Sequence, residues 1–149
     1  MGGAAGYTRG MKKVVLYTDG GARGNPGPAG AGAVIAEENG TVIKEVSEFL
    51  GKQTNNFAEY QAVILGLKKL KQLFGNAVWH MDIEVRLDSE LIVRQLSGKY
   101  QIKEPTLFPQ YIAVHNMRVK DFPHVTFRHI PREKNKEADR LANEAMDQA

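Results

Sequence analysis

The strongest constraint on the fold is a short apolar stretch that runs directly into an acidic side chain. Residues 14–21 read Val-Val-Leu-Tyr-Thr-Asp-Gly-Gly. A run of β-branched and other apolar residues closed by two glycines is typical of a strand buried on both faces. A carboxylate at the end of such a strand requires counter-charges, hydrogen bonds or a raised pKa. Asp19 is therefore a candidate functional residue, although many strands end in Asp only to start a turn.

The size and composition of the chain are those of one ordinary globular domain. It has 149 residues, no cysteine and a formal net charge of +3, a mild basic excess that permits an anionic partner. The lack of cysteine excludes disulfides and thiolate metal sites. The sequence also has no signal-peptide core and no membrane-spanning segment. Together these features predict a cytoplasmic protein without membrane contact. Residues 1–10 hold four glycines, so we expect a disordered leader or an artificial extension there and a single domain over residues 11–149.

Hydrophobic periodicity predicts three consecutive strands followed by alternating helices and strands. The expected strands are 14–19, 33–36, 42–50, 83–87 and 125–130, and the expected helices are 57–74, 90–96, 104–118 with an interruption near Pro109, and a closing helix around 138–145. Asn39 and Gly40 predict a type I′ turn between the second and third strands. This order is typical of an α/β three-layer fold with a mixed five-stranded sheet and helices on both faces.

Four carboxylates are expected at one edge of this sheet. Asp19 and Asp88 end two strands, and open α/β sheets bind ligands at the carboxyl ends of their parallel strands. Glu59 and Asp139 fall near the amino ends of two expected helices, where the helix dipole favours negative charge. Each acid alone is explained as easily by turn or helix-start chemistry. Together, two carboxylates about 5 Å apart repel by about 3 kcal/mol, so their convergence requires a cation.

The residue types indicate which cation such a cluster would bind. Hard oxygen ligands without His or Cys favour Mg²⁺, with Mn²⁺ as a substitute. Mg²⁺ usually takes one or two carboxylates together with waters and phosphate oxygens of a substrate. Two such ions can activate water and stabilise the leaving oxygen in an in-line phosphoryl displacement. The cluster therefore predicts metal-dependent phosphoryl chemistry.

Four sequence blocks between Lys12 and Ala145 resemble type 1 ribonuclease H. The blocks are Thr-Asp-Gly-Gly at 18–21 with Gly-Asn-Pro-Gly-Pro at 24–28, Thr-Asn-Asn-Phe-Ala-Glu at 54–59, Asp-Ser at 88–89, and Asn-Lys-Glu-Ala-Asp-Arg-Leu-Ala at 135–142. The resemblance implies a ribonuclease H-like fold and endonucleolytic hydrolysis of the RNA strand of RNA/DNA hybrids, which leaves 5′-phosphate and 3′-hydroxyl ends. It also implies two Mg²⁺ ions held by Asp19, Glu59, Asp88 and Asp139, with Asp19 bridging and Glu59 close to the 2′-hydroxyl beside the scissile phosphate.

The same resemblance implies a set of substrate contacts. The candidate residues are Gly20, Asn25, Asn55, Asn56, Ser89, Lys99, Arg132 and Asn135. Asparagine amides can both donate and accept in a minor groove, but turn chemistry explains Asn25, Asn55 and Asn56 equally well.

The chain departs from the best-known bacterial pattern in two places. Residues 98–103 stand where a longer basic protrusion would be, as in the shorter archaeal-like branch, so substrate grip would depend on Lys99, Lys103 and other lysines. His129 is the histidine at the spacing of the family's catalytic histidine, yet it falls at the end of an expected strand. Arg132 and Glu133 in the following loop are alternatives for that role.

Three functions remain open at this point. The first is the metal-dependent nuclease, and the second is a hybrid-binding module without activity. The third is another phosphoryl-transfer enzyme of the same superfamily, such as a transposase, integrase or junction-resolving core. Double-stranded RNA is a second candidate substrate, because its A-form geometry and 2′-hydroxyls are shared with a hybrid. No obligate protein partner is indicated, and we expect a monomer.

Overall fold

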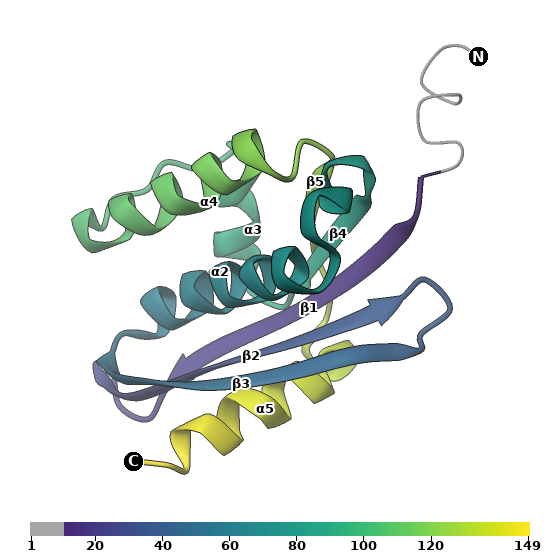
Figure 1. Ribbon diagram of the computed structural model, residues 1–149. Helices are drawn as coiled ribbons and strands as arrows, with labels where there is room; N and C mark the ends of the chain where they lie inside the picture. Colours follow the sequence, from purple (N-terminus) through teal and green to yellow (C-terminus); the bar gives the residue numbers. More distant parts are fainter. Residues whose placement is uncertain (1–10) are drawn as a thin grey trace.

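The computed structural model describes residues 11–149, so the leader predicted for residues 1–10 lies outside the described residues. Five strands form one mixed sheet in the order β3-β2-β1-β4-β5, with helices on both of its faces (Figure 1). The strands are β1 Lys13–Ala22, β2 Gly27–Glu37, β3 Val42–Gln53, β4 Asp82–Leu87 and β5 Val125–His129. The α-helices are α2 Asn55–Phe74, α3 Glu90–Leu96, α4 Phe108–Lys120 and α5 Lys136–Met146, and the 3₁₀ turns are η1 Gly75–His80, η2 Pro105–Leu107 and η3 Arg132–Lys134. The predicted α/β three-layer fold is confirmed.

Strand pairing brings two of the predicted acids to one edge of the sheet. β2 is antiparallel to β1 and to β3, whereas β1, β4 and β5 run parallel to one another. The parallel strands therefore end at the same edge. Tyr17 of β1 and Arg86 of β4 are the last pair between these strands, so Asp19 and Asp88 follow two residues later, just beyond the end of the β1–β4 pairing.

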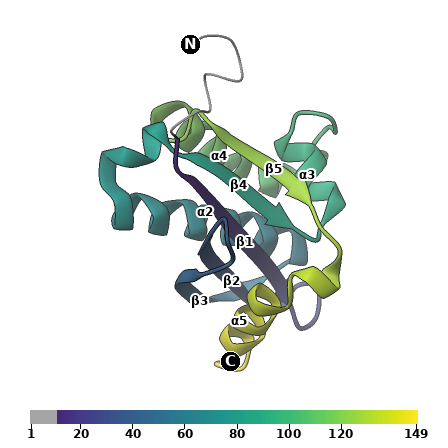
Figure 2. The ribbon, with the colours of Figure 1, turned by 90° about the vertical axis from the view of Figure 1, so that its right-hand side faces the viewer.

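The helices cover the sheet unevenly. In Figure 1, α2, α3 and α4 lie on one face, and α5 lies on the other beneath β1, β2 and β3. Figure 2, turned by 90°, shows β4 and β5 in front, with α5 below them rather than over them. Among residues 11–149, none of the helices has the length and apolar character that a bilayer crossing requires.

The approach of α5 to the sheet depends on two glycines of β2. A Cβ at Gly30 would lie 2.5 Å from the Ala142 carbonyl oxygen, and one at Gly32 would lie 2.4 Å from that of Ala138. Real Cβ atoms do not come this close to backbone atoms, so only glycine allows the helix to sit at this distance. The contact fixes α5, and Asp139 with it, against the sheet.

Helix α2 begins two residues earlier than predicted. Thr54 is its N-cap, and the Thr54 hydroxyl accepts a hydrogen bond from the Phe57 amide at 3.2 Å. Glu59 therefore lies in the second turn, and no acidic residue occupies the first. The expectation that the helix dipole stabilises Glu59 is wrong, because that effect is confined to the first turn.

The turn between β2 and β3 is not type I′. That turn requires positive φ at both central residues, and no non-glycine residue among those described has a positive φ. Instead, Gly40 alone is left-handed, with φ 96°, and its amide donates to the Glu37 carbonyl oxygen at 2.9 Å. The Asn39 side-chain oxygen accepts from the Thr41 amide at 2.9 Å, which is an Asx-turn contact that competes with the predicted geometry.

Pro109 starts a helix rather than interrupting one. The segment predicted as one broken helix consists of the 3₁₀ turn η2 followed by α4, and Pro109 lies in the first turn of α4. Proline is favoured there because that turn has no amide partner to lose and its φ is already helical.

Candidate active site

Three carboxylates converge at the carboxyl edge of the parallel strands. Oxygen atoms of Asp19, Glu59 and Asp88 all lie within 4.8 Å of one another. They come from β1, the second turn of α2 and the residue after β4. The predicted strand end at Asp19 is wrong, because β1 continues to Ala22 along its antiparallel partner β2. Asp139, from the first turn of α5, lies close enough to Asp19 to raise the pKa of that carboxyl. The structure thus brings together all four acids predicted from the sequence.

Burial and mutual repulsion raise the pKa of two of these acids. Asp19 and Glu59 are each only 8% exposed. Burial, followed by the charges of Asp88 and Asp139, raises the pKa of Asp19 to about 8. Burial and the charges of Asp19 and Asp88 raise the pKa of Glu59 well above its usual value, while the Arg132 charge lowers it. Without a cation the cluster holds protons at neutral pH, and its hard oxygen donors fit a divalent metal such as Mg²⁺ or Mn²⁺.

We expect the stability of the metal-free protein to fall between about pH 4 and pH 8. The folded protein keeps a proton on Asp19 up to about pH 8, whereas the unfolded chain loses it near the ordinary value of 3.8. The stabilising proton is therefore fully present below the unfolded pKa and is lost as the pH rises through the folded one. Urea unfolding across this range tests the expectation. Saturating Mg²⁺ should flatten the fall, and stability that rises with pH in metal-free buffer would contradict the clustered geometry.

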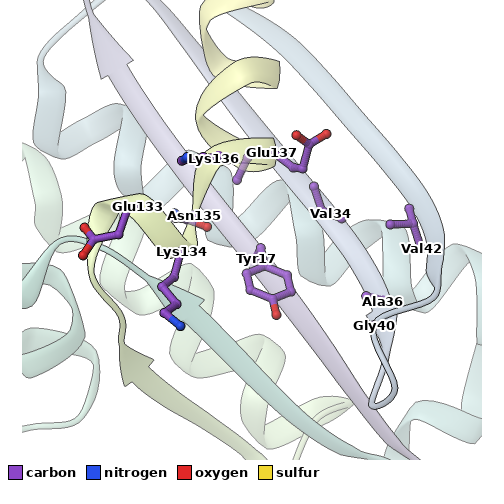
Figure 3. Close-up of a pocket in the computed structure, with 11 residues that line it drawn as sticks. Tyr17, Val34, Ala36, Gly40, Val42, Glu133, Lys134, Asn135, Lys136 and Glu137 are labelled. Atoms are coloured by element: carbon purple, nitrogen blue, oxygen red, sulfur yellow. The ribbon is translucent and has the colours of Figure 1, made fainter.

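Two contacts hold the carboxylates in position. The Gly20 amide donates to Glu59 Oε1 at 3.0 Å. Asn135 Nδ2 donates to the Thr18 carbonyl oxygen at 2.9 Å and to Asp88 Oδ2 at 3.4 Å. Asn135 is 1% exposed and caps the start of α5 beside a cavity of about 230 Å³ (Figure 3). Its substrate contact remains a prediction, because in this structure its side chain is buried and ties α5 to β1 and β4.

The three asparagines of the first two motif blocks all make hydrogen bonds within the described chain. Asn25 Oδ1 accepts from the Asn55 amide at 2.9 Å, and Asn55 Oδ1 accepts from the Ala22 amide at 2.8 Å. Asn56 Nδ2 donates to Glu104 Oε1 at 2.8 Å. Sequence reasoning gave Glu104 no role, because this contact joins residues 48 apart and has no local signal.

Two further predicted contacts, Ser89 and Lys99, lie at the start of α3 and in the segment after it. Ser89 is the N-cap of α3, where its hydroxyl accepts from the Ile92 amide at 3.4 Å. Lys99 is exposed and borders a cleft of about 480 Å³ together with Lys103. Residues 97–104, between α3 and η2, contain no helix, so the predicted lack of a basic protrusion is confirmed.

The three candidates for the histidine role lie at or after the end of β5. His129 is exposed and pairs with Leu87 of β4, as expected for a residue at a strand end. Arg132 and Glu133 are exposed in η3. The positive charge of Arg132 lowers the pKa of Glu59, a carboxylate of the cluster.

Comparison with solved structures gives close likeness over nearly the whole chain. LC11-RNase H1, isolated from compost by a metagenomic approach, is 51% identical with a TM-score of 0.88, and the match covers 93% of this chain and 98% of that one. The same protein in complex with an RNA/DNA hybrid gives 50% identity and a TM-score of 0.87. RNase H1 from Halobacterium salinarum is 37% identical with a TM-score of 0.83, over 92% of this chain and 99% of that one.

Sequence comparisons agree. Residues 17–145 match the model of a family described as Reverse transcriptase-like. A bifunctional protein of Mycobacterium tuberculosis is 41% identical over 138 residues, which is 92% of this chain. The chain spans 36% of the length of that relative and 66% of the length of Ribonuclease HI from Halobacterium salinarum, which is 39% identical.

Proposed function

Because the chain belongs to the ribonuclease H family, we propose that it is an endonuclease that hydrolyses the RNA strand of RNA/DNA hybrids. The observation that carries this proposal is the convergence of Asp19, Glu59 and Asp88 within 4.8 Å at the carboxyl edge of β1 and β4. A protein that is 50% identical over 91% of this chain has been solved with such a hybrid, which supports the same substrate here.

The acids of the cluster would hold the metal ions that the chemistry requires. We assign Asp19, Glu59, Asp88 and Asp139 as ligands of two Mg²⁺ ions, with Mn²⁺ as a substitute. When bound, these ions activate water and stabilise the leaving oxygen of an in-line displacement, which leaves 5′-phosphate and 3′-hydroxyl ends. The chain's own part is to hold its carboxylates ready: the Gly20 amide orients Glu59, and Asn135 orients Asp88.

The asparagines near the start of α2 are suited to recognise the hybrid. The side-chain oxygens of Asn25 and Asn55 are held by backbone amides, so the orientation of each carboxamide is fixed. Within residues 11–149, their Nδ2 groups have no hydrogen-bond partner. Fixed donors of this kind can bind base edges and sugar oxygens in a minor groove.

The deciding experiment presents one end-labelled sequence in four forms, each with Mg²⁺, Mn²⁺ or EDTA. The forms are RNA/DNA hybrid, double-stranded RNA, single-stranded RNA and double-stranded DNA. Cutting of the RNA strand of the hybrid alone, dependent on metal, is the expected result. Cutting of double-stranded RNA as well would widen the substrate class. Binding of the hybrid without any cutting would identify a binding module and overturn the proposal.

The cellular setting is part of the same proposal. We propose that the protein acts in the cytoplasm as a monomer. The lack of cysteine supports the compartment, and the supply of all four carboxylates by a single chain supports the monomer.

Three substitutions separate Arg132 from His129 as candidates for the histidine role. We expect Arg132→Ala to lower the cleavage rate about tenfold, because it removes the positive charge that acts on Glu59. Arg132→Lys should recover part of the rate, since it keeps the charge but not the planar donor fork. His129→Ala is the matched comparison and should change the rate less than threefold. If single-turnover assays show a larger loss of rate in His129→Ala than in Arg132→Ala, the role belongs to His129.

A further inference from the structure

The face of β4 and β5 that α5 leaves open carries an unusual pair of like charges. Alternation along the strands places Glu84 and Arg86 of β4, and Arg128 of β5, on this face, away from the buried Val85 and Leu87. Arg86 and Arg128 are direct partners across the two strands. Like charges opposite each other destabilise a sheet unless something compensates them. Figure 2 shows this face with no helix in front of it within the described chain.

Glu84 compensates only part of that positive charge. Arg86 Nε donates to Glu84 Oε1 at 2.6 Å, whereas Arg128 Nη1 lies 3.8 Å from the same oxygen. Arg86 is also fixed from its other side, because Nη1 donates to the Tyr17 hydroxyl at 2.9 Å. The side chain of Arg128 is 64% exposed, so its guanidinium remains open to another anion.

These side chains line a cleft that Lys134 also borders. The cleft has a volume of about 320 Å³, and Tyr17, Arg86, Arg128 and Lys134 contribute to its walls. In Figure 3, the side chains of Tyr17 and Lys134 extend in the same direction, from β1 and from η3. Lys134 has no ion pair with any residue of 11–149. Three cations and a hydroxyl therefore face this space, and Glu84 is the carboxylate that pairs with two of the cations, Arg86 and Arg128.

The cleft adjoins the carboxylate cluster. Tyr17 precedes Asp19 by two residues on β1, and Arg86 precedes Asp88 by two residues on β4. Side chains two residues apart on a strand share a face and are separated by about 7 Å. This spacing is comparable to one repeat of a sugar–phosphate chain. A strand with one phosphodiester at the carboxylates could therefore place a neighbouring phosphate in the cleft.

We propose that the cleft between Tyr17, Arg86, Arg128 and Lys134 binds a backbone phosphate of the nucleic-acid strand whose scissile phosphodiester lies at the carboxylates. The inference rests on the proposed function and adds a contact to it. Arg128 and Lys134 supply the charge that meets the phosphate, and Arg86 is held in place by Glu84 and Tyr17 as a fixed wall. The site has no base-specific element, so it would strengthen binding of any sequence.

The first test compares two double variants with the same loss of charge. Arg128→Gln with Lys134→Gln removes the exposed cations of the cleft, whereas Lys68→Gln with Lys120→Gln removes two exposed cations on α2 and α4, across the sheet. Affinity for a hybrid is measured by fluorescence anisotropy in EDTA over a range of salt. The cleft variant should bind the hybrid about fivefold more weakly than the original chain. The slope of log K against log salt concentration should be shallower by about one unit. The control variant should stay within about twofold of the original chain.

A second test locates the phosphate. Single neutral methylphosphonate linkages are placed in turn along the RNA strand. In the original chain, one position beside the scissile linkage should weaken binding, and the cleft variant should be insensitive at that position, because the two losses are coupled. Thermal unfolding of both double variants checks that each is folded.

The outcomes separate the inference from the function on which it rests. Hybrid binding by the cleft variant that equals the original, with the same salt slope, overturns the cleft while the nuclease proposal stands. The cleft proposal is also overturned if the cleft variant loses binding of a mononucleotide but keeps its affinity for the hybrid. That result would indicate a separate site for small anions. An original chain that binds no hybrid overturns both.

Discussion

Replacing Asp19 by Asn should abolish hybrid cleavage and, in metal-free buffer near pH 9, raise the free energy of unfolding by about 1–3 kcal/mol. Asp19 is 8% exposed and faces Glu59, Asp88 and Asp139. Its carboxylate is therefore ionised at that pH against strong repulsion. Asn keeps the shape of the side chain, removes the charge and removes a metal ligand. Loss of activity and gain of stability have the same cause.

The pH and metal dependence of this variant distinguishes relief of repulsion from a general effect on packing. Near pH 4 and below, Asp19 is largely protonated in the folded and in the unfolded original chain, so the two proteins should differ least there. Mg²⁺ should raise the unfolding midpoint of the original chain more than that of Asp19→Asn. Asp82→Asn, at the opposite end of β4, is the control and should leave the pH profile unchanged. A variant less stable than the original at both pH values would mean that the carboxylates are not crowded.

The edge of the sheet at which the site forms could be predicted from the order of elements. Two apolar strands that each end in an acid, and that run parallel, must place Asp19 and Asp88 side by side. The position of Glu59 could not be predicted in this way. The residues before its helix are equally typical of a turn and of a helix N-cap, so the sequence alone placed the start of the helix two residues late. The resemblance to ribonuclease H pointed to Glu59 for a reason unrelated to the helix dipole, and the structure places Glu59 beside Asp19 and Asp88. Tertiary burial, not helix position, determines its pKa.

Features that depend on the register between distant segments could not be predicted. Arg86 and Arg128 become neighbours only because β4 and β5 pair in one particular register. Whether that face is covered depends on where α5 packs, which Gly30 and Gly32 of β2 decide. The turn at Asn39 and Gly40 is also determined by a contact that the dipeptide alone does not indicate. The dipeptide favours a type I′ turn, but the Asn39 side chain accepts from the Thr41 amide and a different turn forms.

The close contact between β1 and α2 makes the replacement of Gly20 costly. A Cβ at Gly20 would lie 2.1 Å from the Ala58 carbonyl oxygen and 2.6 Å from the Glu59 nitrogen. These are backbone atoms of a helix and cannot move singly. Gly20→Ala must push α2 away from β1, and we expect a loss of about 3 kcal/mol or more in the free energy of unfolding.

The neighbouring glycine provides a matched control for that prediction. A Cβ at Gly21 would meet the Met146 Cε at 3.7 Å, an ordinary contact, so Gly21→Ala should change stability by less than about 0.5 kcal/mol. Urea unfolding compares the two variants directly. Where Gly20→Ala remains folded, the displaced helix carries Glu59 away from Asp19, so half-maximal cleavage should require more Mg²⁺ than in Gly21→Ala. Equal stability and equal Mg²⁺ requirement would show that the Gly20 contact does not position the cluster, because the two substitutions add the same methyl group to adjacent residues of one strand.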